Sequence, residues 1–291
     1  GCLPAYAPVV RAALLALADN HFNLNGVQAT THVACPLLVV NGPIRKTIDM
    51  NAGHNLFGSG NRANATIGRA IRLVLLNVGG AWPGELDKST FGHPGKYTYC
   101  IAENEEASPW APYHVEKGYG PEDSTVMLIA AEAPHSVTNQ VADDPEGILD
   151  SLVSCMSTFA HNNAVSAGHC TVIIGPEHAR TISKHSWSRH DVKSYLWYQA
   201  SNRFEDIAFH HRYGKVYNRN LPKWYSRNDK DPIPIVPSID NIHLFCAGGE
   251  AGRFSLFLPG WGHMTSPVLR ALDGSPPASG EVTCVDGMCY L

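Results

Sequence analysis

A glycine-rich loop that leads into an amphipathic helix is the feature that most constrains the fold of this chain. Residues 51–80 read NAGHNLFGSGNRANATIGRAIRLVLLNVGG, with Gly53, Gly58 and Gly60 in the loop. Glycine accepts positive φ angles and leaves no side chain between the backbone and a ligand. Asn61 can cap the helix that follows. Apolar residues then recur at helical spacing, at Ile67, Ile71, Val74, Leu75 and Val78.

The N-terminus of this helix is a candidate anion-binding site. Its free backbone N–H groups and the helix dipole favour negative charge, and Arg62 would lie in the first turn. A tight turn with a solvated Arg62 would explain the same residues, because their spacing matches neither a P-loop nor a GxGxxG fingerprint. Both interpretations remain open. The anion-site interpretation predicts that substrate is bound by Gly58, Gly60, Asn61 and Arg62.

Composition excludes several classes of protein. The 291 residues, 44% of them hydrophobic, can bury a full core in one or two domains. A net charge of −4 and the lack of a long Lys or Arg run argue against nucleic acid as a partner. No uninterrupted apolar stretch approaches the roughly 20 residues of a membrane helix, and the opening GCLP does not resemble a secretory signal. We therefore expect a soluble, cytoplasmic protein that binds neither nucleic acid nor membrane.

Apolar runs of strand length alternate with helical patterns along the chain. The runs that read as buried strands are 35–41, 125–131, 170–174 and 241–247, and 253–258 could pair beside the last of these. Shorter candidate strands lie at 27–32 and 96–102, and further helices are expected at 5–18, 144–160, 176–183 and 188–200. This order predicts an α/β fold with a largely parallel sheet flanked by helices.

We expect two intimately packed lobes, an N-terminal α/β lobe over 1–123 with the glycine-rich loop and a C-terminal α/β lobe over 124–291. Residues 79–123 are rich in Gly, Pro, aromatic and acidic residues and show little periodicity. A long irregular stretch in a compact domain is usually functional, so this segment should cover or line a site. Its acidic cluster consists of Glu103, Glu105 and Glu106, followed by His114. The cluster belongs either to that site or to a solvated turn.

In an open parallel sheet, ligands bind beyond the carboxyl ends of the strands. The ends expected here are 41–43, 132–135, 175–178 and 248–252. Asn41 and Gly249 are therefore candidate substrate-binding residues. The candidate catalytic residues at these ends are Glu132, His135, Glu177 and His178. Glutamate and histidine can serve as general acids and bases or hold a divalent metal. Their spacing matches no metal signature, and a histidine after a strand is also common as a hydrogen-bonded cap, so no metal is assigned.

Two of the eight cysteines are candidate nucleophiles. Cys2 precedes the first helix, whose N-terminus favours a thiolate, and Cys100 precedes the acidic cluster, which disfavours one. Most other cysteines have the apolar context of buried thiols, while the spacing of Cys284 and Cys289 suits a small disulfide loop. Ser255 lies near glycines but has no base close to it in sequence, so a serine hydrolase is not indicated.

Several longer stretches carry a resemblance to a known family. They are GCLPAYAPVV, FNLNGVQATTH, CPLLVVNGPI, GSGNRANATIGRAIRLVLLNVGGAWPGELD, PGKYTYCIAENEEASPW, DSTVMLIAAEAPH, IIGPEHARTI and CAGGEAGRFSLFLPGWG. Through them the chain resembles, over nearly its whole length, the UGSC family of (seleno)proteins, in the long region beyond their small UGSC module. The module carries cysteine or selenocysteine, so the resemblance implies redox or thiol chemistry by association. This chain lacks the module and ends in VTCVDGMCYL, so we expect either that another chain supplies the contribution of the module or that the reaction does not need it.

We expect an enzyme that acts on a small polar substrate bearing a carboxylate or phosphate. The first hypothesis is a thiol-linked oxidoreductase, with Cys2 or Cys100 as the reactive sulfur and Glu103 or a histidine as the proton carrier. The second is a lyase or hydrolase that uses the Glu and His residues at the strand ends, with or without a metal. The third is a non-catalytic partner of a separate redox subunit. The sequence identifies no cofactor, and a homo-oligomer is compatible with it.

Overall fold

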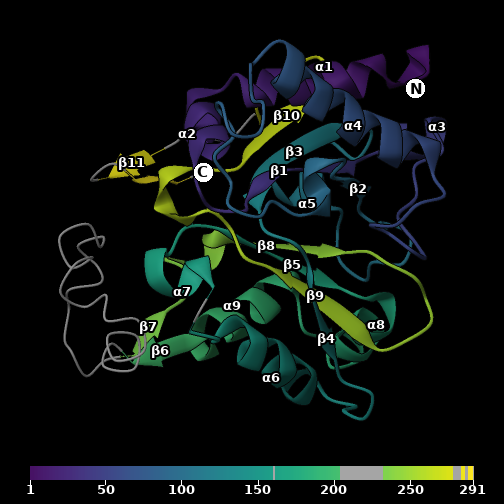
Figure 1. Cartoon of the computed structure of the whole chain (residues 1–291). Coiled ribbons are helices and arrows are strands. Elements are labelled where there is room, and N and C mark those ends of the chain that lie inside the picture. Colours follow the sequence, from purple (N-terminus) through teal and green to yellow (C-terminus); the bar gives the residue numbers. More distant parts are fainter. Residues whose placement is uncertain (160, 204–231, 278–282, 286–287, 291) are drawn as a thin grey trace.

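The described strands form two four-stranded sheets and two short two-stranded sheets in the computed structural model (Figure 1), which describes residues 1–159, 161–203, 232–277, 283–285 and 288–290. The first sheet has the strand order β10-β3-β1-β2. Its strands are β1 (Cys35–Asn41), β2 (Cys100–Ala102), β3 (Thr125–Ala131) and β10 (Val268–Ala271). Strands β1 and β2 run parallel, whereas β3 is antiparallel to both β1 and β10.

The second sheet has the order β4-β9-β5-β8. Its strands are β4 (His135–Thr138), β5 (Cys170–Ile174), β8 (Ile242–Cys246) and β9 (Phe254–Leu258). Strands β5 and β8 run parallel, and β9 is antiparallel to both β4 and β5. The expectation that 253–258 lies beside 241–247 is wrong, because β9 pairs with β5 and leaves β8 at the edge.

The fold is mixed α/β, and the expectation of a largely parallel sheet is wrong. Within the described residues each four-stranded sheet has one parallel pair, and its other neighbouring strands are antiparallel. Strand direction was not readable from the sequence because β1, β3, β5 and β8 are buried along nearly their whole length. A continuous apolar run indicates burial on both faces, which parallel strands usually have, and β3 has the same run although it is antiparallel to both of its neighbours.

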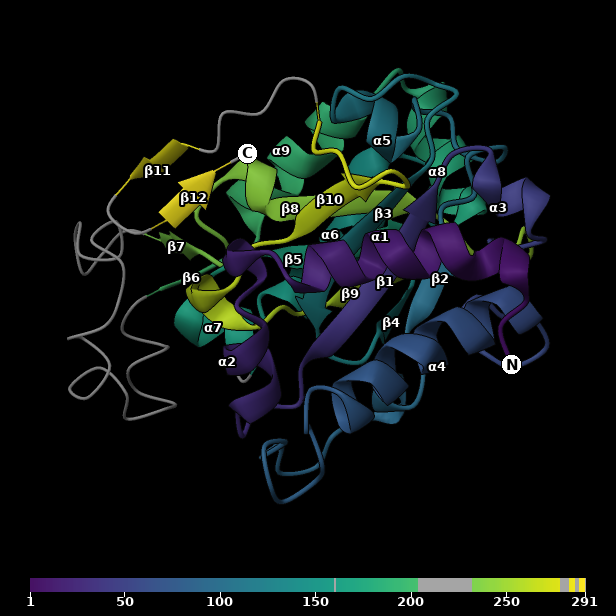
Figure 2. The same cartoon turned by 90° about the horizontal axis from the view of Figure 1, so that it is seen from above.

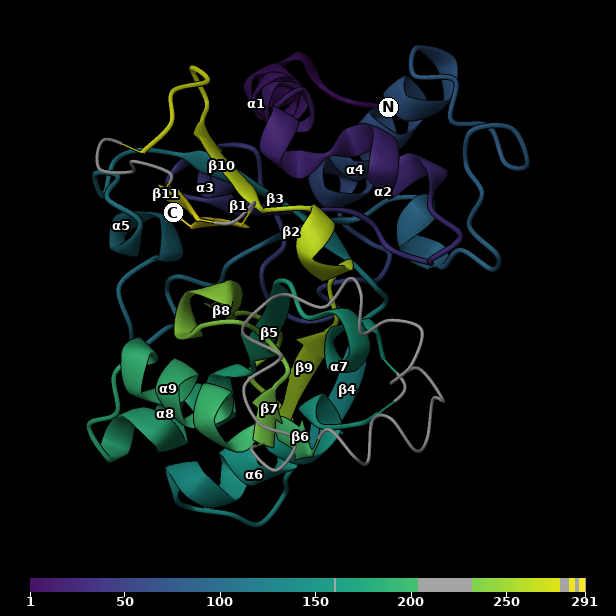
Figure 3. The same cartoon turned by 90° about the vertical axis from the view of Figure 1, so that its left-hand side faces the viewer.

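Helices cover the outer face of each sheet, so the two sheets lie between two layers of helices (Figures 1 and 3). The outer helices are α1 (Ala7–Leu17) and α4 (Arg62–Asn77) on the first sheet, and α6 (Pro145–Met156), α8 (Pro176–Lys184) and α9 (Arg189–Gln199) on the second. Seen from above, α1 crosses the strands of the first sheet (Figure 2).

The two faces of β1 belong to different apolar cores. Leu38 and Val40 join the cluster beneath α1 and α4. Leu37 and Val39 join a cluster that also contains Ile173 of the second sheet. This division follows from the alternation of side chains along a strand. The two sheets therefore pack face to face through a shared core, and a third cluster lies between the second sheet and its helices.

The structure confirms two predicted helix caps. Helix α4 begins after Asn61, whose side chain accepts a hydrogen bond from Asn64 N at 3.0 Å. Helix α9 begins after Ser188, which forms a capping box with Asp191. Val78 was expected on the apolar face of α4, but the helix ends at Asn77 and this side chain is 82% exposed.

Short elements complete the described chain and correct two expected strands. They are α2 (Leu24–Ala29), α3 (Ile44–Thr47), α5 (Tyr113–Glu116), α7 (Asn162–Ser166), β6 (Ser201–Arg203), β7 (Pro232–Pro234), β11 (Thr283–Val285), β12 (Met288–Tyr290) and 3-10 turns at Pro4–Tyr6, Asn20–Phe22, Pro94–Lys96, Ile239–Asn241 and Gly262–Met264. Helix α2 occupies the first half of the expected strand at 27–32, because Asn23 is left-handed and its side chain accepts a hydrogen bond from Gly26 N. Of 96–102, only Cys100–Ala102 is a strand.

The lobe boundary expected between residues 123 and 124 falls inside the first sheet, because β3 and β10 follow it in sequence, and β3 pairs with β1 while β10 pairs with β3. Strands β11 and β12 pair with Cys284 opposite Cys289, and a disulfide between them stays a prediction. The polar, proline-bounded sequence of residues 203–235 predicts a surface excursion, and most of it, including His210 and His211, lies outside the described residues. Within the described ranges, no helix combines the length and the apolar character needed to cross a membrane.

Candidate functional site

The carboxyl ends of the two parallel strand pairs meet where the sheets face each other. Asn104 N, just beyond β2, donates a hydrogen bond to Cys246 O at the end of β8 at 2.8 Å. Gly248 N donates to Ala52 O at 2.9 Å, which joins the end of β8 to the glycine-rich loop. Asn41 closes β1 beside β2. Ala247 N donates to Ile174 O at 3.3 Å, so the end of β5 lies beside that of β8. Three of the four strand ends predicted to converge, 41–43, 175–178 and 248–252, are therefore close together.

Glu103 is the centre of this junction and is fully buried. Its Oε1 accepts hydrogen bonds from Arg189 Nη2 at 2.8 Å and from Cys246 N at 3.4 Å. Its Oε2 accepts from Tyr113 N at 2.8 Å and from the Asn41 amide. Burial raises the pKa of Glu103, and the Arg189 guanidinium opposes that shift. Because protein donors occupy both oxygens, this carboxyl group anchors the two layers to each other.

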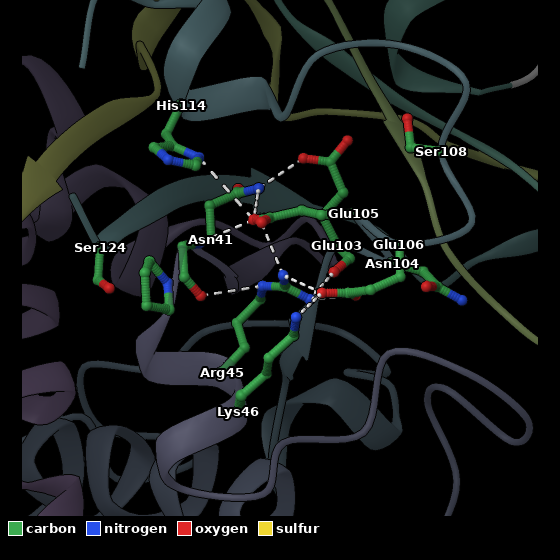
Figure 4. Close-up of polar contacts among 12 residues, drawn as sticks. Asn41, Arg45, Lys46, Glu103, Asn104, Glu105, Glu106, Ser108, His114 and Ser124 are labelled. Atoms are coloured by element: carbon green, nitrogen blue, oxygen red, sulfur yellow. Dashed lines mark hydrogen bonds and ion pairs between the residues drawn. The ribbon is translucent and has the colours of Figure 1, made fainter. Parts of the chain in front are cut away.

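Glu105 and Arg45 extend this arrangement toward the surface (Figure 4). Glu105 Oε1 accepts hydrogen bonds from Gly42 N at 2.7 Å and from the Asn41 amide at 3.0 Å, and its Oε2 accepts from Arg45 Nη2 at 2.6 Å. The Arg45 guanidinium also contacts Glu106 at 3.1 Å, and its hydrogen bond lowers the pKa of that carboxyl to about 2. We call Asn41, Arg45, Glu103, Glu105 and Arg189 the Glu103 network.

His114 is the exception beside this network. Its side chain is buried, and neither ring nitrogen has a hydrogen-bond partner among the described residues. Its Nδ1 lies 3.8 Å from Glu105 Oε1, too far for a hydrogen bond. Burial lowers the pKa of His114, so the imidazole is neutral at pH 7. The Oδ1 atom of Asn41 is likewise buried without a partner.

A pocket of about 420 Å³ lies beside the glycine-rich loop. Phe57 and Gly58 form one wall, and His93, Tyr99 and Cys100 form another. The start of α4 and the residues that follow Glu132 complete it. We call this the glycine-loop pocket. Gly58 and Cys100 are the two predicted site residues that line it, and most of its wall is apolar.

Cys100 and Cys2 occupy different environments. Cys100 is buried in β2, and burial raises the pKa of its thiol. Cys2 is exposed, and its Sγ donates a hydrogen bond to Thr66 O at 3.2 Å. The thiolate is the nucleophilic form of cysteine, so the protonated Cys100 thiol is a poor nucleophile.

His93 brings an imidazole to the pocket wall that the sequence did not single out. Its Nδ1 accepts a hydrogen bond from Gly95 N at 3.1 Å, so in the neutral ring Nε2 carries the proton. Nε2 lies 3.2 Å from Cys35 Sγ. Burial lowers the pKa of His93 and raises that of Cys35 to about 12. This pair is a neutral contact, not an activated thiolate and imidazolium.

Glu132 and His135 do not join Asn41, because β3 is antiparallel to β1. The register pairs Asn41 with Thr125 and Cys35 with Ala131. Glu132 therefore lies about seven residues, or about 23 Å, along the sheet from Asn41. Its carboxylate accepts a hydrogen bond from His32 at 2.8 Å. His135 is an exposed residue of β4.

Glu177 and His178 lie in the first turn of α8. His178 is buried, with Nδ1 2.8 Å from Ser255 Oγ and Nε2 3.1 Å from Asn139 O. Ser255 therefore has a neighbouring base, contrary to the expectation from sequence, because α8 and β9 are distant in the chain. The side chains of Ser255 and His178 are both buried, and the third group in this arrangement is the backbone carbonyl of Asn139. Glu132 N bonds Pro259 O, about 13 Å along β9 from Ser255, so Glu132 and His178 do not form one site.

The remaining predicted substrate-binding residues have structural partners. Arg62 donates from Nε to the backbone oxygen of the first residue at 3.0 Å, and Asn61 caps α4. Gly60 has a φ of +116°, a conformation that favours glycine. Gly249 packs against the loop, since a Cβ there would lie 2.2 Å from His54 Nδ1. These contacts support the tight-turn interpretation of the loop more than an anion site at Arg62.

In the part of the chain that the structure describes, no three His, Cys, Asp or Glu side chains gather in a way that could hold a metal ion. Comparison of the chain with protein-family models, curated proteins and solved structures gives no match. The resemblance to the UGSC family therefore stays a prediction from the sequence.

Proposed function

We propose that this chain binds a small molecule in the glycine-loop pocket. The observation that carries the proposal is the pocket itself, whose volume of about 420 Å³ falls in the range of small-molecule sites. Phe57 and Tyr99 offer aromatic surface there, with ring centroids 5.7 Å apart. Polar groups from Ser59 and Thr98 also line it. This combination suits a ligand with an apolar or aromatic body and few polar groups.

The lining supports a neutral ligand better than the carboxylate or phosphate substrate expected from the sequence. No Lys or Arg is among the described lining residues, and Arg62 is directed toward the first residue of the chain. A buried anion without a cationic or N–H partner would be costly. The pocket therefore favours uncharged aromatic or aliphatic compounds.

Thiol chemistry in this pocket would depend on Cys100 alone. Burial raises the pKa of that thiol, so an oxidoreductase reaction would require ligand binding to stabilise the thiolate. Binding alone, as in a non-catalytic partner of a redox subunit, has no such requirement. The lyase or hydrolase hypothesis has less support, because Glu132 and His178 have separate partners.

Binding of a neutral aromatic probe tests the proposal. Indole binding, measured by saturation-transfer NMR, should weaken at least about tenfold in an Ala65→Leu variant. Ala65 lines the pocket, so the larger leucine side chain would fill part of it, and the methyl group that it replaces makes no hydrogen bond. Ala111→Leu makes the same change at an exposed position outside the lining and should bind as the wild type does. Equal binding by all three proteins, or no binding by the wild type, would reject the pocket as the site.

A further inference from the structure

A second pocket, of about 440 Å³, lies at the other end of α4 from the glycine-loop pocket. Helices α1, α2 and α4 all contribute to its wall, together with the loop that follows α4. Ala65 lines the first pocket and Leu75 lines the second, and these residues are about 15 Å apart along α4. We call the second cavity the Gln28 pocket. Its volume falls in the range of small-molecule sites.

Gln28 brings an oriented amide to the wall of this pocket. Arg72 Nη1 donates a hydrogen bond to Gln28 Oε1 at 3.2 Å. A guanidinium group can only donate, so the amide oxygen faces Arg72 and the NH₂ group faces away from it. Arg72 is itself held by Asp87 at 2.9 Å and by the Ala81 carbonyl at 3.3 Å. The orientation of the amide is therefore fixed without a ligand.

The NH₂ group of Gln28 is an unused hydrogen-bond donor. The residue is only 3% exposed, and within the described part of the chain its Nε2 donates no hydrogen bond. Nε2 is not one of the side-chain atoms that are fully buried without a partner, so it reaches the surface of the pocket that Gln28 lines. A donor left without a partner in such a place is costly. An acceptor on a ligand in the pocket would remove that cost.

The rest of the wall is largely aliphatic and offers no free charge. Its aliphatic side chains are those of Leu17, Ala18, Leu24, Leu75, Ala81 and Leu86. No Lys, Arg or His is among the described lining residues, and Asp19 is the one acidic residue among them. Asp19 Oδ1 accepts a hydrogen bond from His21 N at 2.9 Å, and its Oδ2 accepts one from Arg270. A charged ligand would therefore lose its hydration without gaining a counter-charge.

We propose that the Gln28 pocket binds a small neutral carbonyl compound with an aliphatic body, of the amide or ketone class. The carbonyl oxygen accepts a hydrogen bond from Gln28 Nε2, and the aliphatic body lies against Leu17, Leu24 and Leu75. A carboxylate is disfavoured because no cationic side chain lines the pocket. An ammonium group is disfavoured because Gln28 presents a donor to it. This site is separate from the glycine-loop pocket and does not depend on it.

Three compounds of nearly the same shape test the ligand class: isovaleramide, isovalerate and isopentylamine. Isovaleramide, added to the full chain, should shift the side-chain NH₂ signals of Gln28 and the methyl signals of Leu75 in NMR spectra, with saturation at millimolar concentration. Isovalerate is anionic and isopentylamine is cationic at pH 7, so each should bind at least about tenfold more weakly. Binding of either charged compound as tightly as isovaleramide would overturn the ligand class. Absence of saturation by isovaleramide would overturn the site.

Gln28→Glu tests the donor, because it keeps an acceptor for Arg72 and removes both N–H groups. Isovaleramide binding, followed through the Leu75 methyl signals, should weaken at least about tenfold. Gln199→Glu makes the same change at an exposed position at the end of α9 and should bind as the wild type does. Wild-type binding by Gln28→Glu, or equal weakening in the two variants, would contradict the proposal.

Ala18→Leu keeps the test valid even where Gln28→Glu unfolds the protein. Ala18 is exposed and lines the pocket, so a leucine there would fill part of the cavity and leave Gln28 unchanged. Isovaleramide binding should again weaken at least about tenfold. Ala7→Leu, at an exposed position at the other end of α1, should have no effect. Unchanged binding by Ala18→Leu would place the ligand outside the Gln28 pocket.

Discussion

The Glu103 network and the glycine-loop pocket arise from similar sequence signals, but the first is filled by protein hydrogen bonds and the second encloses open space. Both contain residues that follow or flank strands of the first sheet. In the Glu103 network, the two oxygens of Glu103 are occupied by donors from β1, β8, α5 and α9. In the glycine-loop pocket, by contrast, apolar and aromatic side chains surround about 420 Å³ of space.

The difference shows that a dense group of charged residues is not by itself a binding site. Buried charges are tolerated when paired and hydrogen-bonded. Glu103 and Glu105 already accept hydrogen bonds at both carboxylate oxygens, which leaves them little capacity to bind a ligand. The network therefore contributes mainly to stability and to the alignment of the layers. The pocket, which has fewer charges, retains the room that binding requires.

Substituting Glu103 gives the largest expected effect. It tests whether the Glu103 network only stabilises the fold or also takes part in binding, which would contradict the contrast drawn above. Glu103→Gln removes the buried one of the two carboxylates that are paired with Arg189, whose side chain is also buried. Removing one partner of a buried ion pair costs about 3–5 kcal/mol. We therefore expect the free energy of unfolding in urea to fall by about 3 kcal/mol, with indole binding by the folded protein unchanged.

The Arg180–Glu250 pair is a matched control for this substitution. Its side chains are 45% and 63% exposed, and the atoms are 3.1 Å apart. Exposed pairs contribute about 0–1 kcal/mol, so Glu250→Gln should change the stability little. A Glu103→Gln protein as stable as Glu250→Gln would show that the network does not hold the layers together.

Local features of the fold were predictable from the sequence, whereas its pairing was not. The runs at 35–41, 125–131 and 170–174 match β1, β3 and β5, because a buried strand needs a continuous apolar segment. The cap at Ser188 was readable from four neighbouring residues. Strand direction depends on contacts between distant segments, and its reversal in β3 moved Glu132 to the other end of the sheet.

The candidate sites show the same limit. Asn41 and Glu103 were singled out separately, and the parallel pairing of β1 and β2 brings them together. Arg189 was not identified, because it is 86 residues from Glu103 and reads as an ordinary first helical residue. His93 lies in the irregular segment that was expected to line a site. The imidazole of His93 and the Pro-Gly pair that follows it were the sequence features that could have identified it as a site residue.

Thiol reactivity gives the next largest effect and sharpens the description of the pocket. Iodoacetamide should modify exposed Cys2 readily and Cys100 at least about 100-fold more slowly, because burial both raises the pKa of Cys100 and blocks access. Mass spectrometry of the folded protein over time measures the ratio, and unfolding in urea should abolish it. Fast modification of Cys100 in the folded chain would restore the thiol hypothesis. Loss of indole binding when only Cys2 is modified would place the ligand outside the pocket.

His114 gives the smallest expected effect and the finest test of whether the Glu103 network is closed. Its two buried nitrogens lack well-formed hydrogen bonds within the described part of the chain, so His114→Leu should stabilise the protein at pH 7 by about 1 kcal/mol. Burial lowers the pKa of His114 from 6.5, so below pH 6.5 the unfolded state binds a proton that the folded state resists. Wild-type stability should therefore decrease as the pH falls from 6.5 toward the lower folded value, and less steeply in His114→Leu. Urea unfolding at several pH values measures this, with the exposed His190→Leu as the control. A large loss of stability in His114→Leu would instead mean that a ligand or ordered water completes the network there.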